Sequence, residues 1–341
     1  MFDKKSIFKI ALITISSAKL IAMILIAAGL LTSCSMSING FNGITASDNI
    51  ISKDISNADF SKIEVTGSPK VEYSQSPDSQ CKVSVTGPDN IIELLDIRIE
   101  NGTLKVSYKK NTNIKLNGKA ITIHASSPKI NAARLTGSGD IIFVTNILCE
   151  NLGLQLSGSG DITTKSIRCN KLDAVLSGSG DVELNSQTFA NSTSLKVSGS
   201  GDISVKELAT KTLYAILEGS GDMEISQVLA NDIYTKLSGS GDIRIKGIKA
   251  TGLDASLSGS GDMKLSGDVQ SCALNLNNSG AISAEKLHSE NTIASLSGSG
   301  YISCNATNTL ATTINGSGNI SVSGKPQNVK SSGKKAPSLK D

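Results

Sequence analysis

The chain has 341 residues, of which 32 are glycine and none is tryptophan. Its net charge of +3 arises within the first 33 residues, which hold four lysines and a single aspartate, so the rest of the chain is neutral overall. A neutral body lacks the broad basic surface on which nucleic-acid binding depends, and we expect no nucleic-acid partner.

The N-terminal segment is typical of an exported protein. Lys4, Lys5 and Lys9 precede an apolar run of twelve residues at 20–31, which is short for a membrane span and suits a signal-peptide core. The run leads into the sequence LTSC, which ends at Cys34 and resembles a bacterial lipobox. We predict a lipoprotein signal peptide over residues 1–33 and lipidation of Cys34. The alternative is an ordinary cleaved signal with a chance cysteine.

Lipidation would attach the protein to a membrane through Cys34, since each buried methylene of an acyl chain contributes about 0.8 kcal/mol. We therefore expect an outer-membrane lipoprotein that faces either the periplasm or the cell surface. Residues 34–47 are rich in serine, asparagine, glycine and threonine, and they are predicted to form a flexible tether.

Residues 48–131 are predicted to form an N-terminal β region. Alternating apolar and polar residues indicate strands at 62–65, 70–73, 82–85 and 97–99. Asn101-Gly102 is a strong hairpin signal, and Pro88 with the two residues after it would open one short helical turn. Because an uncapped repeat stack exposes its core and its strand edges, we assign this region the role of a cap.

From residue 132 to residue 324, a Gly-Ser-Gly-Asp phrase or a weaker copy of it returns every 18–21 residues, which indicates a repeat architecture. Its central serines are Ser138, Ser159, Ser179, Ser200, Ser220, Ser240, Ser260, Ser279, Ser299 and Ser317. Two, four and six residues before each phrase the side chains are mostly apolar, with polar or mixed residues between them. That period of two predicts a strand with one buried face.

A second apolar column follows the phrase, as at Ile141 and Ile162, and a third inward position recurs near Ile147 and Ile167. Each repeat thus contains two clear strands and the trace of a third, separated by polar corners. The repeat region has no helical periodicity. We predict an all-β fold, a parallel β-solenoid with coils of about 20 residues, in which like residues stack at strand spacing of about 4.8 Å.

The corner phrase has a structural interpretation and a chemical one. Its glycines would allow positive φ where the chain turns, and its aspartates would bond nearby backbone N–H groups as in an Asx turn. The aspartates are Asp140, Asp161, Asp181, Asp202, Asp222, Asp242 and Asp262. Because stacked carboxylates repel one another, the alternative is a ladder that binds calcium, a metal that prefers oxygen ligands. The column ends in Ala281, Tyr301 and Asn319, so calcium would not occupy the full length.

We predict no catalytic residues. His124 and His288 are far apart in the sequence and have no evident partners, and no cysteine–histidine cluster supports a zinc site. Tyr214 and Tyr234 share one repeat column and would form a small exposed patch.

Two further features concern the cysteines and the C-terminus. Cys149 and Cys169 occupy equivalent positions in adjacent repeats, where either a disulfide or two buried thiols would fit. Residues 325–341 contain five lysines and two prolines and are predicted to form a basic disordered tail.

Three stretches carry a family resemblance: residues 60–68 (FSKIEVTGS), residues 101–106 (NGTLKV) and the serial LSGSGD phrase. In this order they resemble the auto-transporter adhesin head GIN domain proteins, and the resemblance spans most of residues 47–329. It implies a right-handed β-helix similar to pectin-lyase-like solenoids without their catalytic residues, and it suggests a role in adhesion.

We therefore expect a non-enzymatic, lipid-anchored cell-envelope protein, an adhesion or scaffold rod with a glycan or protein partner. The competing hypotheses are a carbohydrate-active β-helix enzyme that processes polysaccharides and a purely structural periplasmic lipoprotein. Acids that converge in one groove would favour the enzyme.

Overall fold

Strands make up nearly all of the described chain. The computed structural model describes residues 43–78, 80–110 and 112–339, and its Ile44–Asp341 portion packs as one unit. Over these ranges the helical content is the short α2 (Asp89–Ile92), and none of it is long and apolar enough to cross a membrane. The predicted signal peptide at 1–33, the lipidation site Cys34 and the tether up to residue 42 lie outside the described residues.

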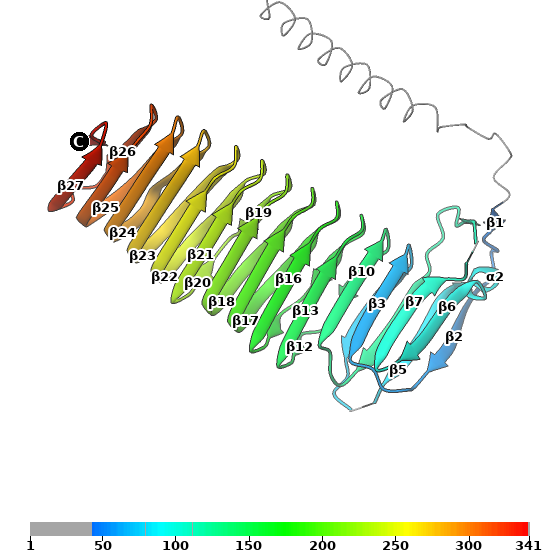
Figure 1. The fold of residues 1–341 in the computed structure, drawn as a ribbon. Helices are drawn as coiled ribbons and strands as arrows, with labels where there is room; N and C mark the ends of the chain where they lie inside the picture. Colours follow the sequence, from blue (N-terminus) through cyan, green and yellow to red (C-terminus); the bar gives the residue numbers. More distant parts are fainter. Residues whose placement is uncertain (1–42, 79, 111, 340–341) are drawn as a thin grey trace, which may run out of the picture. The chain divides into compact units, whose positions relative to one another are not determined.

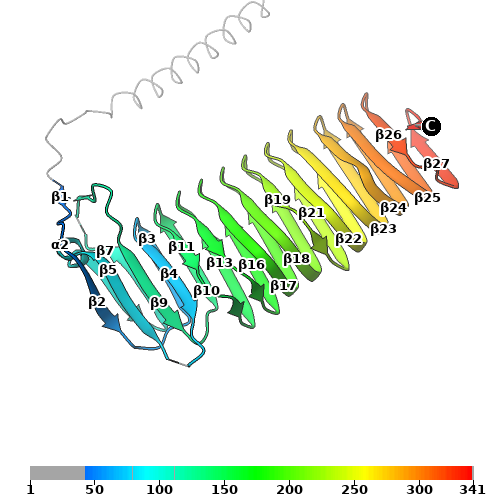
Figure 2. The same cartoon turned by 180° about the vertical axis from the view of Figure 1, so that it is seen from behind.

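Each repeat forms one coil of three strands joined at polar corners. In one coil these are β13 (Asn151–Leu156), β14 (Ile162–Thr164) and β15 (Ile167–Arg168). The chain then enters β16 (Lys171–Leu176), which pairs in parallel with β13 so that Leu176 lies beside Leu156. The predicted β-solenoid with coils of about 20 residues is thereby confirmed, and Figures 1 and 2 show the coils stacked in one row.

The other strands of the stack repeat this arrangement, and several continue around a corner. In chain order they are β10 (Ala132–Gly137), β11 (Ile141–Phe143), β12 (Ile147–Leu148), β17 (Val182–Val197), β18 (Ile203–Leu217), β19 (Met223–Ile225), β20 (Val228–Leu229), β21 (Asp232–Leu237), β22 (Ile243–Leu257), β23 (Asp262–Asn278), β24 (Ala281–Gly298), β25 (Tyr301–Ile314), β26 (Asn319–Ser323), β27 (Asn328–Gly333) and β28 (Ser338–Leu339).

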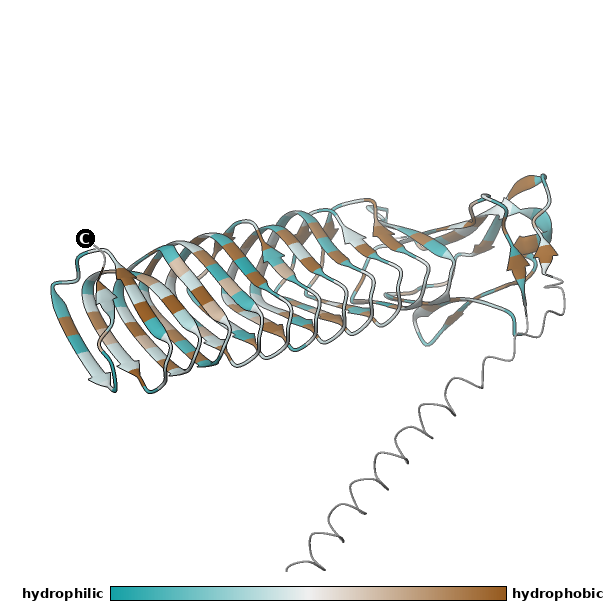
Figure 3. Cartoon of the chain, turned by 90° about the horizontal axis from the view of Figure 1, so that it is seen from above, coloured by the Kyte–Doolittle hydropathy of each residue, from teal (hydrophilic) through white to brown (hydrophobic). Residues whose placement is uncertain are grey.

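The core is a set of apolar columns that run along the stack. Leu135, Leu156 and Leu176 stand in register and are at most 1% exposed. The third inward position is also buried, as at Ile147 and Ile167. Hydrophobic and hydrophilic residues alternate along the strands (Figure 3), and burying each large apolar side chain contributes about 1.5–3 kcal/mol.

The N-terminal region joins antiparallel strands to the first coil. Its elements besides α2 are β1 (Ile44–Thr45), β2 (Ile50–Ser56), β3 (Lys62–Gly67), β4 (Lys70–Gln75), β5 (Lys82–Pro88), β6 (Leu95–Glu100), β7 (Thr103–Tyr108), β8 (Ile114–Lys115) and β9 (Thr122–Ser127). Strands β3 and β4 pair in parallel with β10 and β11, whereas β2 and β9 pair with β5 in antiparallel fashion. The predicted hairpin is confirmed: β6 and β7 pair across Asn101 and Gly102, both at positive φ.

Two predictions about the ends of this unit are wrong in part. Residues 44–47 were assigned to the tether, but β1 pairs with β8 and Ala46 is buried. In the predicted disordered tail, β27 pairs with β25 and β28 with β26. The edge of β25 offers unpaired backbone groups that β27 satisfies. All six residues of β27 are exposed, so its sequence lacks the apolar alternation by which strands are recognised.

The glycines of the corner phrase serve a different purpose from the predicted one. Positive φ is largely absent from them; Gly158 and Gly160, for example, do not adopt it. They are required because successive corners lie backbone against backbone. A Cβ on Gly158 would lie 1.8 Å from the carbonyl oxygen of Gly137, and one on Gly160 would lie 1.7 Å from that of Gly139. The phrase therefore sets how closely the coils stack.

Candidate functional site

The aspartates of the corner phrase form a hydrogen-bonded ladder along the stack. In each step, Oδ1 of one aspartate accepts a hydrogen bond from the backbone N–H of the equivalent residue in the next coil. The steps run from Asp140 to Asp161 (3.2 Å), Asp161 to Asp181 (2.9 Å), Asp181 to Asp202 (2.8 Å), Asp202 to Asp222 (2.6 Å), Asp222 to Asp242 (2.8 Å), Asp242 to Asp262 (2.9 Å) and Asp262 to Ala281 (3.1 Å).

This geometry corrects the predicted Asx turn, because each carboxylate caps a backbone group of the neighbouring coil instead of one in its own turn. One oxygen of every aspartate is thus engaged. Where metal ligands are concerned, residues 43–78, 80–110 and 112–339 contain no cluster of three or more histidine, cysteine, aspartate or glutamate side chains. The ladder itself has a structural role, and calcium binding stays an alternative hypothesis.

One arginine reinforces the ladder. Arg244 on β22 donates from Nη1 to Oδ2 of Asp222 (2.8 Å) and from Nη2 to Oδ2 of Asp242 (2.6 Å). Partial burial raises the pKa of Asp222, but hydrogen bonds from Arg244 and from the backbone of Asp242 outweigh it and hold the pKa below its usual value. Arg244 therefore offsets the repulsion between two stacked carboxylates.

The two histidines lie on different elements and have different neighbours. Nδ1 of His124 on β9 lies 3.5 Å from Oε2 of Glu72, and Nδ1 of His288 on β24 lies 3.0 Å from the amide nitrogen of Asn305. These neighbours were not evident from the sequence, because they come from adjacent coils. The two histidines do not share one site.

Cys149 and Cys169 are free thiols in adjacent coils. The hydrogen bond that joins their side chains lowers the pKa of Cys149 and raises that of Cys169, which burial raises further. Of the two arrangements that the sequence allowed, the structure contains the pair of thiols.

An outward column on the third strand of the coils borders two hollows on the surface of the solenoid. Leu148, Arg168, Phe189, Ala209 and Leu229 follow one another at paired positions, and the column continues to Lys249. Leu148 is 65% exposed and Leu229 is 59% exposed, so the column presents large apolar side chains to solvent.

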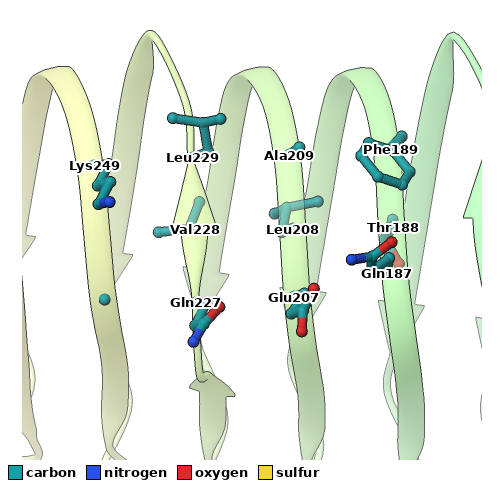
Figure 4. A pocket seen from close by; sticks show the side chains of 11 residues that line it. Gln187, Thr188, Phe189, Glu207, Leu208, Ala209, Gln227, Val228, Leu229 and Lys249 are labelled. Atoms are coloured by element: carbon teal, nitrogen blue, oxygen red, sulfur yellow. The ribbon is translucent and has the colours of Figure 1, made fainter.

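Within this column, Ala209 forms the floor of a notch between two larger side chains. Phe189 stands on one side and Leu229 on the other (Figure 4). The hollow that they border encloses about 320 Å³, with Glu207, Gln227 and further polar residues along one edge. A neighbouring hollow of about 540 Å³ shares the same three column residues. We call the two hollows together the Ala209 groove.

The Ala209 groove combines apolar walls with positive charge. The guanidinium of Arg168 lies 4.6 Å from the ring centroid of Phe189, a cation–π contact that holds it beside the groove. Lys211 lines the second hollow and Lys249 the first, and Glu207 is the acid among the lining residues. The arrangement suits a ligand that carries apolar groups and negative charge.

Sequence reasoning missed this groove. The signal was available, because Phe189 and Leu229 stand ten residues before their corner glycines, next to an inward position. The repeat pattern identified the inward neighbours, but whether the outward residues border a hollow depends on how large side chains stand beside the small Ala209 in three dimensions.

Comparison with known proteins finds solved structures and a family model that resemble the chain. Three solved structures resemble it: a "putative adhesin" from Bacteroides fragilis (22% identity, TM-score 0.39, covering 87% of this chain and 99% of that chain), a "putative adhesin" from Parabacteroides merdae (19%, 0.45, 88% and 99%) and a "putative lipid binding protein" from Parabacteroides distasonis (22%, 0.38, 88% and 100%). No curated protein matches the chain.

A family model described as "Putative auto-transporter adhesin, head GIN domain" matches residues 59–247 and 226–326, which together cover most of the chain and include the corner aspartates and the Ala209 groove. The chain therefore belongs to the head GIN domain family.

Proposed function

We propose that this protein is a non-enzymatic, lipid-anchored adhesion protein of the cell envelope, and that the Ala209 groove is its contact site for a protein partner. The observation that carries the proposal is the pair of apolar side chains on either side of Ala209: Leu229, which is 59% exposed, and Phe189, which is half-buried. Aromatic and apolar side chains with an adjacent arginine are the residue types that dominate binding energy at protein interfaces. The adhesin description of the family agrees with this proposal.

The charge of the groove indicates the partner. Arg168, Lys211 and Lys249 surround the apolar column, with Glu207 as the acid among the lining residues. An acidic protein segment with protruding leucine or phenylalanine side chains would bury the apolar column and pair with these cations. The groove keeps a fixed shape because backbone hydrogen bonds join its coils. Binding should therefore cost little conformational entropy in the groove.

Binding of labelled peptides to residues 44–341 tests the proposal. The probes are short peptides rich in leucine, phenylalanine and glutamate, together with a matched set that carries lysine in place of glutamate. We expect the acidic set to bind, with an affinity that falls as salt rises. Ala209→Leu fills the notch and should weaken binding about tenfold or more, a change of about 1.4 kcal/mol.

The matched control is Ala311→Leu, since Ala311 is another outward, half-buried alanine on β25. This variant should bind like the unmodified protein, and both variants should melt within a few degrees of it. Equal binding of the acidic and basic peptides, or undiminished binding by Ala209→Leu, would overturn the proposed site.

A further inference from the structure

The rings of Tyr214 and Tyr234 form an exposed aromatic platform beyond the corner that follows the Ala209 column. They occupy paired positions on β18 and β21. Their centroids are 5.2 Å apart with planes inclined by 14°, and the residues are 43% and 44% exposed. The exposed patch predicted for these two residues is confirmed. Because Tyr214 covers one face of the Tyr234 ring, the other face is directed toward the next coil.

A groove begins at that free face of Tyr234. It crosses the paired positions Asp254 and Ala273 and ends at Ile293, which is 57% exposed and forms the far wall. The floor is low because Gly252 and Ala273 carry little or no side chain, and the hollow encloses about 280 Å³. We call it the Tyr234 groove.

The acid on the floor has no cation beside it. Asp173 stands in the same column as Asp254, and Lys171, two residues earlier, pairs with it at 2.7 Å. In the coil of Asp254 the position of that lysine is taken by Gly252. Within the described ranges Asp254 has no ion pair, so both of its oxygens are available as acceptors.

Two further polar groups reach the same groove. Oδ1 of Asp232 lies over Gly252, only 2.9 Å from where a Cβ on that glycine would stand. Oδ1 of Asn291 accepts a hydrogen bond from Thr309 at 2.7 Å. That bond leaves the amide nitrogen of Asn291 as the group that can donate to a ligand.

We propose that the Tyr234 groove binds a neutral carbohydrate. A sugar ring has an apolar C–H face that fits against the exposed face of Tyr234, and hydroxyl groups at its rim that donate to Asp254 and Asp232 and accept from Asn291. Two carboxylates without a paired cation would repel sulfated or uronic-acid sugars, so the chemistry selects neutral ones. This site shares no lining residue with the Ala209 groove, and the inference stands independently of the function proposed there.

The experiment uses an array of neutral oligosaccharides derived from β-glucan, xylan, mannan and chitin, with sulfated and uronic-acid oligosaccharides at the same salt concentration. Residues 44–341 are applied, and the affinity of each hit is measured by calorimetry. We expect binding to neutral members only. Tyr234→Ala should weaken it fivefold or more, since an aromatic contact of this kind contributes on the order of a tenfold change in affinity. Asp254→Asn should weaken it less, because the amide keeps one acceptor.

Tyr301→Ala is the matched control, because Tyr301 is a strand tyrosine that is 37% exposed and lies outside the groove. It should bind like the unmodified protein. The inference is overturned if no neutral oligosaccharide binds, if acidic oligosaccharides bind better, or if Tyr234→Ala and Tyr301→Ala bind equally well. Peptide binding at the Ala209 groove should be unchanged in Tyr234→Ala, which separates a failure of one site from a failure of the other.

Discussion

Oδ1 of Asp161 accepts the backbone N–H of Asp181 at 2.9 Å, one coil further along the stack. The carbonyl of Asp181 in turn accepts the N–H of Ile162, which follows Asp161, also at 2.9 Å. Each corner is therefore joined to its neighbour in both directions, once through a side chain and once through the backbone. The side chain supplies an acceptor where the tight corner does not present a carbonyl to the aspartate N–H.

Removing one acceptor from the ladder should lower stability. Asp202→Ala leaves the N–H of Asp222 without the acceptor that now lies 2.6 Å away. Loss of a comparable capping bond costs about 0.5–2 kcal/mol, so we expect a lower melting temperature by circular dichroism. Asp202→Asn keeps an oxygen in place and should melt close to the unmodified protein. If the asparagine variant were as unstable as the alanine variant, the charge would matter more than the acceptor.

Calcium should have little effect on stability. Oδ1 of each aspartate in the ladder already accepts a backbone N–H, and each corner contributes only one acid, whereas calcium takes six to eight oxygen ligands. We expect equal melting temperatures in calcium and in EDTA at the same ionic strength. A ligand present at one hundred times its Kd would stabilise the fold by about 2.7 kcal/mol. A melting temperature that is clearly higher in calcium than in EDTA would therefore establish the metal ladder.

The bridge formed by Arg244 should give a pH-dependent contribution to stability. The pKa of Asp222 is held below its ordinary value in the folded protein, so the folded state binds fewer protons than the unfolded state. This contribution is complete above the unfolded pKa of about 3.9 and is lost as the pH falls through the lower folded value. Arg244→Gln should therefore lower the melting temperature at pH 7, with a difference that shrinks under strongly acidic conditions.

Lys246→Gln provides the control for this variant. Lys246 lies on the same strand and pairs with Glu224, but both side chains are well exposed, and exposed ion pairs contribute little. We expect its melting temperature to stay near that of the unmodified protein from neutral to acidic pH. A pH dependence equal to that of Arg244→Gln would contradict a special role for the Asp222 bridge.

The sequence predicted the solenoid well because its signal is repeated. Leu156 and Leu176 are two members of a long column, and one irregular coil does not obscure the period. The apolar pattern did not predict strand β27, because β27 lacks an apolar face and forms by pairing with the edge of β25. A local apolar pattern cannot reveal a strand that buries no side chain and is held by backbone pairing and by hydrogen bonds of the Ser332 hydroxyl to β25.

The candidate site was predicted less well because its contacts join neighbouring coils. The exposed patch at Tyr214 and Tyr234 followed from their shared column, and the structure confirms it. The bond from Asp161 to the next coil was assigned to its own turn, since the path of the corner is not encoded in residue type. Grooves such as the one over Ala209 depend on which side chains flank a small residue in three dimensions.

The predicted lipidation of Cys34 would make membrane attachment depend on the side chain of this one residue. In Cys34→Ala the acceptor of the lipid is absent, so the protein should move from the detergent phase to the aqueous phase in a partition experiment. Ser35→Ala, one residue further, should remain in the detergent phase. Equal partition of the two variants would favour the ordinary cleaved signal instead.

Because the corners of successive coils lie in backbone contact, the effect of a glycine-to-alanine substitution on the melting temperature should depend strongly on where the glycine lies. A Cβ on Gly180 would lie 1.9 Å from the carbonyl oxygen of Gly160, an overlap that the coils can relieve only by moving apart. Gly153 lies in β13, where the nearest atom to an added Cβ is 3.9 Å away. Gly180→Ala should therefore lower the melting temperature sharply or prevent folding. Gly153→Ala should be neutral or stabilising by about 0.4–1 kcal/mol, because it restricts the unfolded chain. If both variants melted alike, backbone contact between corners would not be what requires glycine in the repeated phrase.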